Sequence, residues 1–175
     1  MSAVELNLDR LERGRSALSF DTELVREPLD DEETESRVAV VGELPVDDMD
    51  QRILVHGSFT AKQSAQCDRC NREFELTTQA ELEVMILRNP SRGDEVEDAQ
   101  DAWIIHQQGG IVSLDQALLE AVSLAEPQKF LCRDDCKGLC PNCGADWNEN
   151  GCECTQDEVD SRWAALEKLR EKDPS

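Results

Sequence analysis

The chain has 175 residues, enough for one domain of ordinary size or for a domain with a small metal-stabilised appendage. Asp and Glu number 39 against 18 Lys and Arg, which gives a formal net charge of −21 and an isoelectric point near 4.3. A field of this sign repels phosphate backbones and attracts basic protein segments. Only 4% of the residues are aromatic and Tyr is absent, so stacking on single-stranded bases is also disfavoured.

Apolar residues occur in short runs, such as Val38 to Val41 and Val84 to Leu87. A membrane-spanning helix needs roughly 20 residues, so we expect no membrane association. The first residues, MSAVELNLDRLERGR, lack the basic start, apolar stretch and small-residue cleavage site of a secretory signal. We therefore expect a cytoplasmic protein whose thiols are in a reducing compartment.

Acidic residues are concentrated in two stretches. Residues 21–50 hold twelve of them against Arg26 and Arg37, and a second block covers residues 94–101. Such compositions are typical of mobile or weakly ordered surface loops. Carboxylates could in principle hold Mg²⁺, but clusters arise easily by chance in so acidic a chain; the cluster in question is Asp47, Asp48 and Asp50.

Three segments have the composition of β-strands. RVAVVGELPV (37–46) and RILVHGSFTAKQSAQC (52–67) are rich in β-branched residues and are interrupted by glycine or proline. In EFELTTQAELEVMILR (73–88) the apolar residues fall at even positions, which is the period of a half-buried strand. These segments predict an antiparallel meander that could close into a barrel.

Two later segments have helical periodicity. In IVSLDQALLEAVSLAEP (111–127), Ser113 is the predicted N-cap, Gln116 lies at the spacing of a capping box, and Pro127 ends the helix. TQDEVDSRWAALEKLREK (155–172) has the same pattern with Thr155 as its cap.

The predicted fold class is α+β: the sheet, then a helix, a cysteine-rich zinc loop and a C-terminal helix that packs back on the body. Residues 1–128 are predicted to form the strand-rich body and its helix. Residues 129–175 are predicted to form the zinc module with the last helix.

Eight cysteines carry the strongest chemical signal. Two form a Cys-x-x-Cys pair, and six more lie within 23 residues of the second half. In a reducing compartment this density favours thiolates around tetrahedral zinc over disulfides. The first pair is Cys67 and Cys70, and the later six are Cys132, Cys136, Cys140, Cys143, Cys152 and Cys154.

The segment GLCPNCG is the most specific of these motifs, because the glycine after Cys-Pro-Asn-Cys allows a backbone conformation that other residues disfavour. We assign Cys140 and Cys143 to a structural zinc ion. The later cysteines could complete that site, and Cys67 and Cys70 could supply further ligands or a second site. One full site with a partial second, or two full sites, both fit the count.

Four basic residues lie beside the cysteines. Because four thiolates on Zn²⁺ leave a formal charge of −2, we expect these side chains to balance that charge. The alternative is that they form a local patch that contacts RNA phosphates. They are Arg69, Arg72, Arg133 and Lys137.

Catalytic alternatives have less support. Cys67 and Cys70 could be a redox dithiol, but such a pair usually precedes a helix, and here the following residues predict a strand. His56 and His106 are the only histidines, and each is isolated in the sequence. We therefore predict that the protein is not an enzyme.

The order of these motifs resembles the YceD-like family, whose members are known as large ribosomal RNA subunit accumulation proteins. The resemblance rests on CDRC in the strand-rich half, VSLD opening a helix that ends at AEP, LCRDDCKGLCPNCGADWN, and SRWAALEKLRE. It extends from about the first strands to residue 170. Its most specific stretches are 67–70 and 132–154.

The resemblance implies a non-enzymatic cytoplasmic factor, without a small-molecule substrate, that is needed for accumulation of large-subunit (23S) ribosomal RNA and for ribosome assembly. Together with the net charge, it suggests an acidic surface that contacts a basic ribosomal protein or a large-subunit precursor. Three alternatives stay open: a zinc module that binds RNA directly, a thiol redox protein and an RNA-processing hydrolase.

Overall fold

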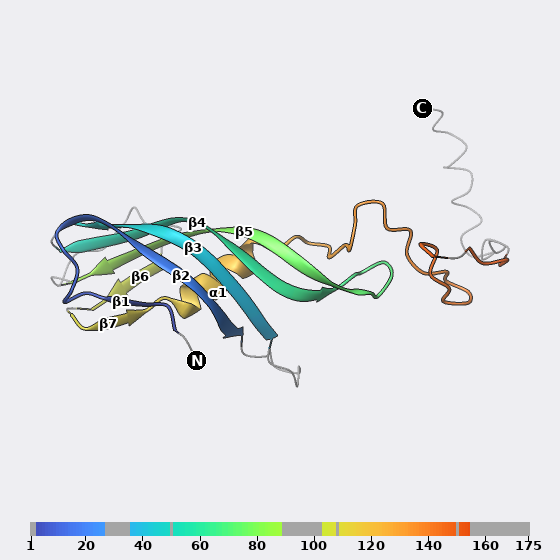
Figure 1. Ribbon diagram of the computed structural model, residues 1–175, viewed down its shortest axis with the longest axis horizontal. Helices are drawn as coiled ribbons and strands as arrows, with labels where there is room; N and C mark the ends of the chain where they lie inside the picture. Colours follow the sequence, from blue (N-terminus) through green and yellow to red (C-terminus); the bar gives the residue numbers. More distant parts are fainter. Residues whose placement is uncertain are drawn as a thin grey trace, which may run out of the picture.

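The computed structural model describes residues 3–26, 36–49, 51–88, 103–107, 109–149 and 151–154. Its main element is a five-stranded sheet in the order β2-β3-β4-β5-β6 (Figure 1). A two-stranded sheet of β1 and β7 lies beside it, and one helix follows β7. The bounds are β1 Glu5–Asn7, β2 Gly14–Arg26, β3 Ser36–Asp48, β4 Arg52–Gln66, β5 Glu73–Leu87, β6 Trp103–His106, β7 Ile111–Ser113 and α1 Asp115–Ala125.

Strands β2 to β5 form an antiparallel meander, as the sequence predicts, and β6 adds to β5 in parallel. The prediction that the sheet could close into a barrel is wrong. Among the described residues, β2 and β6 occupy opposite edges of the large sheet and do not pair. Closure would require these two edges to meet, whereas one face of the sheet is already covered by α1 and the β1–β7 pair (Figure 1).

The hydrophobic core lies between that face and α1. Alternate residues of β3, β4 and β5 point into it because successive side chains of a strand point to opposite faces. Leu114, Leu118 and Val122 meet them from the helical side and are fully buried. The sheet residues of this core include Val38, Val40, Leu44, Val46, Ile53, Val55, Phe59, Ala61, Ala80, Leu82, Val84 and Ile86.

The start of α1 differs from the prediction. Its N-cap position is Leu114, which has no side-chain cap hydrogen bond. Ser113 is instead the last residue of β7, where it pairs with Glu5, so the predicted capping box with Gln116 does not form. The Asp115 carboxylate accepts a hydrogen bond from the backbone N–H of Val4 at 2.7 Å, and this tertiary contact anchors the first turn.

The acidic stretch 21–50 was predicted to be a mobile surface loop, and this prediction is wrong for most of its described residues. Residues 21–26 belong to β2 and residues 36–48 form β3, so these parts are regular strands. Asp21, Glu23 and Glu43 are exposed and alternate with buried or half-buried side chains, whereas Asp48 at the end of β3 is buried. Residues 27–35, the second acidic block and the predicted C-terminal helix lie outside the described residues.

The end of α1 directs the chain towards the cysteines. Glu126 is extended and precedes Pro127, in agreement with the predicted stop. Its carboxylate accepts hydrogen bonds from Arg26 of β2 and Gln63 of β4, each at 2.8 Å, which fixes the helix end to the sheet. No helix in the part of the chain that the structure describes is long and apolar enough to cross a bilayer.

Candidate metal centres

The eight cysteines gather into two groups of four. We call Cys67, Cys70, Cys132 and Cys136 centre 1, and Cys140, Cys143, Cys152 and Cys154 centre 2. Within each group the sulfur atoms all lie within 4.8 Å of one another. Each group could therefore hold a metal ion.

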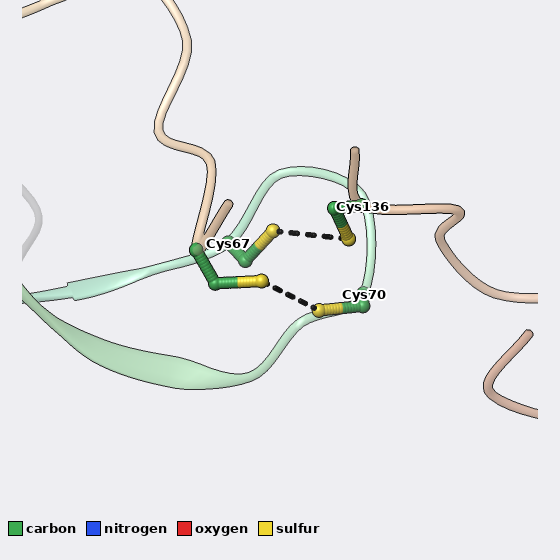
Figure 2. Close-up of side chains that lie close together, drawn as sticks. Cys67, Cys70 and Cys136 are labelled. Atoms are coloured by element: carbon green, nitrogen blue, oxygen red, sulfur yellow. Dashed lines mark hydrogen bonds between the residues drawn. The ribbon is translucent and has the colours of Figure 1, made fainter. Parts of the chain in front are cut away.

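Centre 1 joins the sheet to the segment after α1. Cys67 and Cys70 lie in the turn between β4 and β5, and Cys132 and Cys136 approach from the later segment. The Sγ atoms of Cys67 and Cys136 are 3.9 Å apart, and those of Cys70 and Cys132 are 3.7 Å apart (Figure 2). Four thiolates at a Zn–S distance of about 2.3 Å in a tetrahedron would be about 3.8 Å apart. A disulfide would need about 2.05 Å.

Burial and backbone contacts hold centre 1 together. Cys67, Cys70 and Cys136 are at most 7% exposed, and Phe74 and Leu131 pack against them. Two further contacts dock the later segment onto the hairpin turn: Asp68 N–H donates to Phe130 C=O at 2.8 Å, and Leu139 N–H donates to Arg69 C=O at 3.1 Å.

Centre 2 is more exposed and is built from one short segment. Cys140 is buried, whereas Cys143 and Cys154 are exposed. The indole Nε1–H of Trp147 donates to Cys152 Sγ at 3.3 Å. This centre closes a loop of the chain on itself, whereas centre 1 connects two distant parts of the sequence.

The two Cys-x-x-Cys turns have the same backbone hydrogen-bond pattern. In the first, Asn71 N–H donates to Cys67 C=O and Cys67 N–H donates to Arg72 C=O. In the second, Gly144 N–H donates to Cys140 C=O and Cys140 N–H donates to the carbonyl of residue 145. Asn71 and Gly144 occupy equivalent positions with φ of 60° and 71°, a left-handed conformation that asparagine and glycine tolerate best.

In each centre the surroundings lower the pKa of one thiol and raise the pKa of another. A backbone N–H of Cys132 lowers the pKa of Cys67 to about 6, while burial raises the pKa of Cys132 to about 12. In centre 2 the Trp147 N–H lowers the pKa of Cys152 to about 6, and the hydrogen bond with Cys143 raises the pKa of Cys154 to about 12. A divalent cation would favour the thiolate form of all four sulfurs in each centre.

The basic residues singled out in the sequence lie around centre 1. Arg69 Nη1 donates to Cys136 C=O at 2.8 Å, and Arg72 forms ion pairs with Asp146 and Glu149 at 3.2 and 2.6 Å. The guanidinium of Arg133 donates to Asn148 Oδ1 at 2.6 Å and lies 3.4 Å from Asp135. Lys137 is exposed, and its backbone N–H also donates to Asn148 Oδ1.

The other candidate residues lie elsewhere. His56, on β4, is 3.2 Å from Asp47. Arg15 also binds Asp47, and its hydrogen bond holds the pKa of that carboxyl below the usual range. Asp48 is paired with Arg88 at 3.0 Å, so neither aspartate offers a free carboxylate to Mg²⁺. His106 is on β6, and Asp50 lies outside the described residues.

Three contributors to the site were missed by sequence reasoning. Asn71, Trp147 and Asn148 carry no metal-ligand signature, and Asn148 Nδ2 lies 3.5 Å from Cys136 Sγ. The sequence did contain a signal for Asn71: this residue follows Cys67-x-x-Cys70 at the same position at which Gly144 follows Cys140-x-x-Cys143. The hydrogen bonds of Trp147 and Asn148 to sulfur depend on tertiary geometry.

Comparison with known proteins agrees with the motif order. The family described as "Large ribosomal RNA subunit accumulation protein YceD" matches residues 55–170, which include both centres. The chain therefore belongs to the YceD family.

Individual relatives are distant. Uncharacterized proteins of Mycobacterium tuberculosis and Mycobacterium leprae are 29% and 31% identical over 128 and 125 residues, 73% and 71% of this chain. The matches cover 60% and 56% of those proteins, so the chain aligns with less than two thirds of their length. The protein named "Large ribosomal RNA subunit accumulation protein YCED homolog 1, chloroplastic" of Arabidopsis thaliana is 30% identical over 87 residues, 46% of this chain and 27% of its own. No solved structure matches the chain.

Proposed function

We propose that the protein is a non-enzymatic cytoplasmic factor that supports accumulation of large-subunit ribosomal RNA and thereby ribosome assembly. The observation that carries this proposal is the family match over residues 55–170. The matched region contains most of β4, all of β5 and α1, and both candidate centres. The part of the chain shared with the family is thus the part in which the cysteines meet the sheet.

We further propose that each centre binds one structural zinc ion. Four sulfurs within 4.8 Å of one another can fill all four positions around a zinc ion, which leaves none open for a substrate or water and is typical of structural and not of catalytic zinc. In this proposal residues 1–128 form the body and residues 129–175 a module, and Cys67 and Cys70 attach the module to the body. The test is metal content of the purified full chain: two zinc ions per chain support the proposal, and none would contradict it.

The partner we propose is a basic ribosomal protein or a large-subunit precursor that presents one. The exposed face of β5 carries Glu73, Glu75, Glu81 and Glu83. Among the described residues, Glu81 and Glu83 have no ion pair, and the neighbouring β4 residues at their level are Ser58 and His56. The net charge of −21 favours a partner rich in Lys and Arg.

Direct RNA binding by the basic residues has less support. The guanidinium groups of Arg69, Arg72 and Arg133 are already engaged by a carbonyl, by carboxylates and by an amide within the cysteine region. A phosphate would have to displace these partners. The thiol redox alternative is also less favoured, because Cys67 and Cys70 lie in a β-hairpin turn and two further sulfurs complete the group.

The experiment that tests the role is depletion of the protein in its own cell, with measurement of large- and small-subunit ribosomal RNA and of free subunits by sucrose gradient. We expect the ratio of large- to small-subunit RNA to fall and to recover with the wild-type chain. An unchanged ratio would refute the proposed role.

A second experiment tests the partner. The tagged chain is used to capture proteins from a lysate after nuclease treatment. We expect basic ribosomal proteins to remain bound, and the Glu81→Lys/Glu83→Lys double variant to lose them. Capture of deproteinised ribosomal RNA with equal yield would contradict the proposed partner and favour the RNA-binding alternative.

A further inference from the structure

The two centres are connected through two adjacent residues, Trp147 and Asn148. Both lie in the loop between Cys143 and Cys152, which are ligands of centre 2 in the proposal above. The Trp147 indole N–H points to Cys152 of centre 2, at 3.3 Å, and the Asn148 amide N–H points to Cys136 of centre 1, at 3.5 Å. One short segment therefore donates to a sulfur atom in each centre.

The orientation of the Asn148 amide is determined by its neighbours. Its Oδ1 accepts hydrogen bonds from the guanidinium of Arg133 at 2.6 Å and from the backbone N–H of Lys137 at 2.8 Å. Its Nδ2 donates to Asp146 Oδ1 at 2.6 Å as well as to Cys136 Sγ. A flipped amide would place its NH₂ group against two donors, so the N–H must face the sulfur.

The acceptor Asp146 is held in turn by both parts of the site. Its Oδ1 also accepts the backbone N–H of Asn148 at 2.8 Å, and its Oδ2 accepts from Arg72 at 3.2 Å. The backbone N–H of Asn148 keeps the pKa of Asp146 below its usual value, so the carboxylate is ionised at neutral pH. Arg72 belongs to the hairpin turn of centre 1, whereas Asp146 lies in the loop of centre 2.

Backbone contacts also connect the two centres. Trp147 N–H donates to Gly138 C=O at 3.0 Å, and Gly138 lies between the last ligand of centre 1 and the first of centre 2. A Cβ at Gly138 would lie 2.9 Å from the carbonyl oxygen of Arg69, so the chain passes very close to the hairpin turn at this point. The position of the 146–149 turn therefore depends on the folding of both centres.

We propose that Asn148 and Trp147 couple the two centres, so that a metal ion in centre 2 strengthens metal binding in centre 1. Metal in centre 2 closes the loop and holds Asn148 where it donates to Cys136. An N–H that donates to a metal-bound thiolate stabilises its charge, and hydrogen-bonding partners of metal ligands typically change affinity by about 10- to 100-fold. The coupling is reciprocal, so metal in centre 1 strengthens centre 2 by the same factor. This inference rests on the proposed metal-binding role.

The test uses the full chain and site-resolved metal titration. Zn²⁺ is added to the reduced protein, and protection of each cysteine from iodoacetamide is followed by peptide mass spectrometry, which separates centre 1 from centre 2. Chelator competition gives the affinity of each centre. We expect the double substitution Cys143→Ser/Cys154→Ser, which removes centre 2, to weaken centre 1 by about 10-fold.

Asn148→Asp identifies the contact that carries the coupling. Aspartate keeps an oxygen for Arg133 and the Lys137 N–H but places an acceptor in place of the donor against Cys136. We expect about a 10-fold loss of affinity at centre 1 in the intact chain, and little further loss when centre 2 is already removed. Asn142→Asp, at an exposed position in the turn between Cys140 and Cys143, is the matched control for added charge and should leave centre 1 unchanged.

The outcomes are distinguishable. Two metal ions bound with centre 1 affinity unaffected by loss of centre 2 and by Asn148→Asp would overturn the coupling and leave the metal proposal standing. The coupling would also be overturned if Asn148→Asp weakened centre 1 by the same factor with and without centre 2, because additive effects need no shared contact. Absence of metal from both centres would overturn the proposed metal role and this inference together.

Discussion

Substitution of one ligand in centre 1 should release the later segment from the hairpin without unfolding the sheet. Four described hydrogen bonds dock residues 130–139 on the turn, two from the backbone and two that use the side chains of Asp68 and Arg69. At about 1 kcal/mol each they contribute about 4 kcal/mol. A structural zinc ion typically contributes about 10–16 kcal/mol, so a metal ion bound as proposed would be the main source of docking. The buried core of the sheet contains no cysteine and should not depend on it.

Hydrogen exchange at two equivalents of Zn²⁺ measures directly whether residues 130–139 stay docked on the hairpin turn. In Cys132→Ser we expect the amides of Asp68, Phe130 and Leu139 to exchange at least 100-fold faster, while amides of β3 and β4 keep their protection. The control, Cys154→Ser, removes a ligand of centre 2. Even if this weakens centre 1 by about 10-fold, a structural site stays occupied at two equivalents of Zn²⁺, so the three amides should stay protected. A chelator should reproduce the effect of Cys132→Ser in the wild-type chain. Unchanged protection of the three amides in the variant, or loss of protection throughout the sheet, would refute the reasoning.

Two further predictions concern single contacts. Arg88→Met removes one partner of the Asp48 carboxylate, at 3.0 Å, and the Asp48 side chain is only 1% exposed. Urea unfolding should show a loss of about 1.5–3 kcal/mol for this variant, the usual contribution of a charged hydrogen bond, against less than about 1 kcal/mol for Arg37→Met, whose ion pair is exposed. Equal losses would contradict this account. Gly144→Asn should keep the zinc affinity of centre 2, because Asn71 adopts the equivalent left-handed conformation in the first turn. Gly144→Val should weaken this affinity by about 10-fold, because the left-handed conformation costs a valine about 1–2 kcal/mol. Gly151→Val is the control: a Cβ there meets no atom within 4 Å, so an equal loss would rule out backbone conformation as the cause.

The strands were accessible to sequence reasoning because their patterns are local. The alternation in 73–88 predicts β5, and burial follows it, with Ala80, Leu82, Val84 and Ile86 inside. The end of α1 just before Pro127 follows from the chemistry of proline in the same way. The start of α1 did not follow from local rules, because the pairing of β1 with β7 takes up Ser113 as a strand residue.

The cysteine spacing alone indicated metal-binding chemistry but left the grouping open. The order of motifs was sufficient to indicate the family by resemblance, and the residue types of the candidate site could be named from the sequence because a thiol carries its metal-binding chemistry wherever it lies. The assignment of Cys67 and Cys70 to Cys132 and Cys136, and the contact of Asn148 with Cys136, depend on where the β4–β5 hairpin ends in space. Residues about 60 to 70 positions apart are brought within 4 Å by the length of two 15-residue strands and the direction in which α1 releases the chain, and no local pattern encodes that distance.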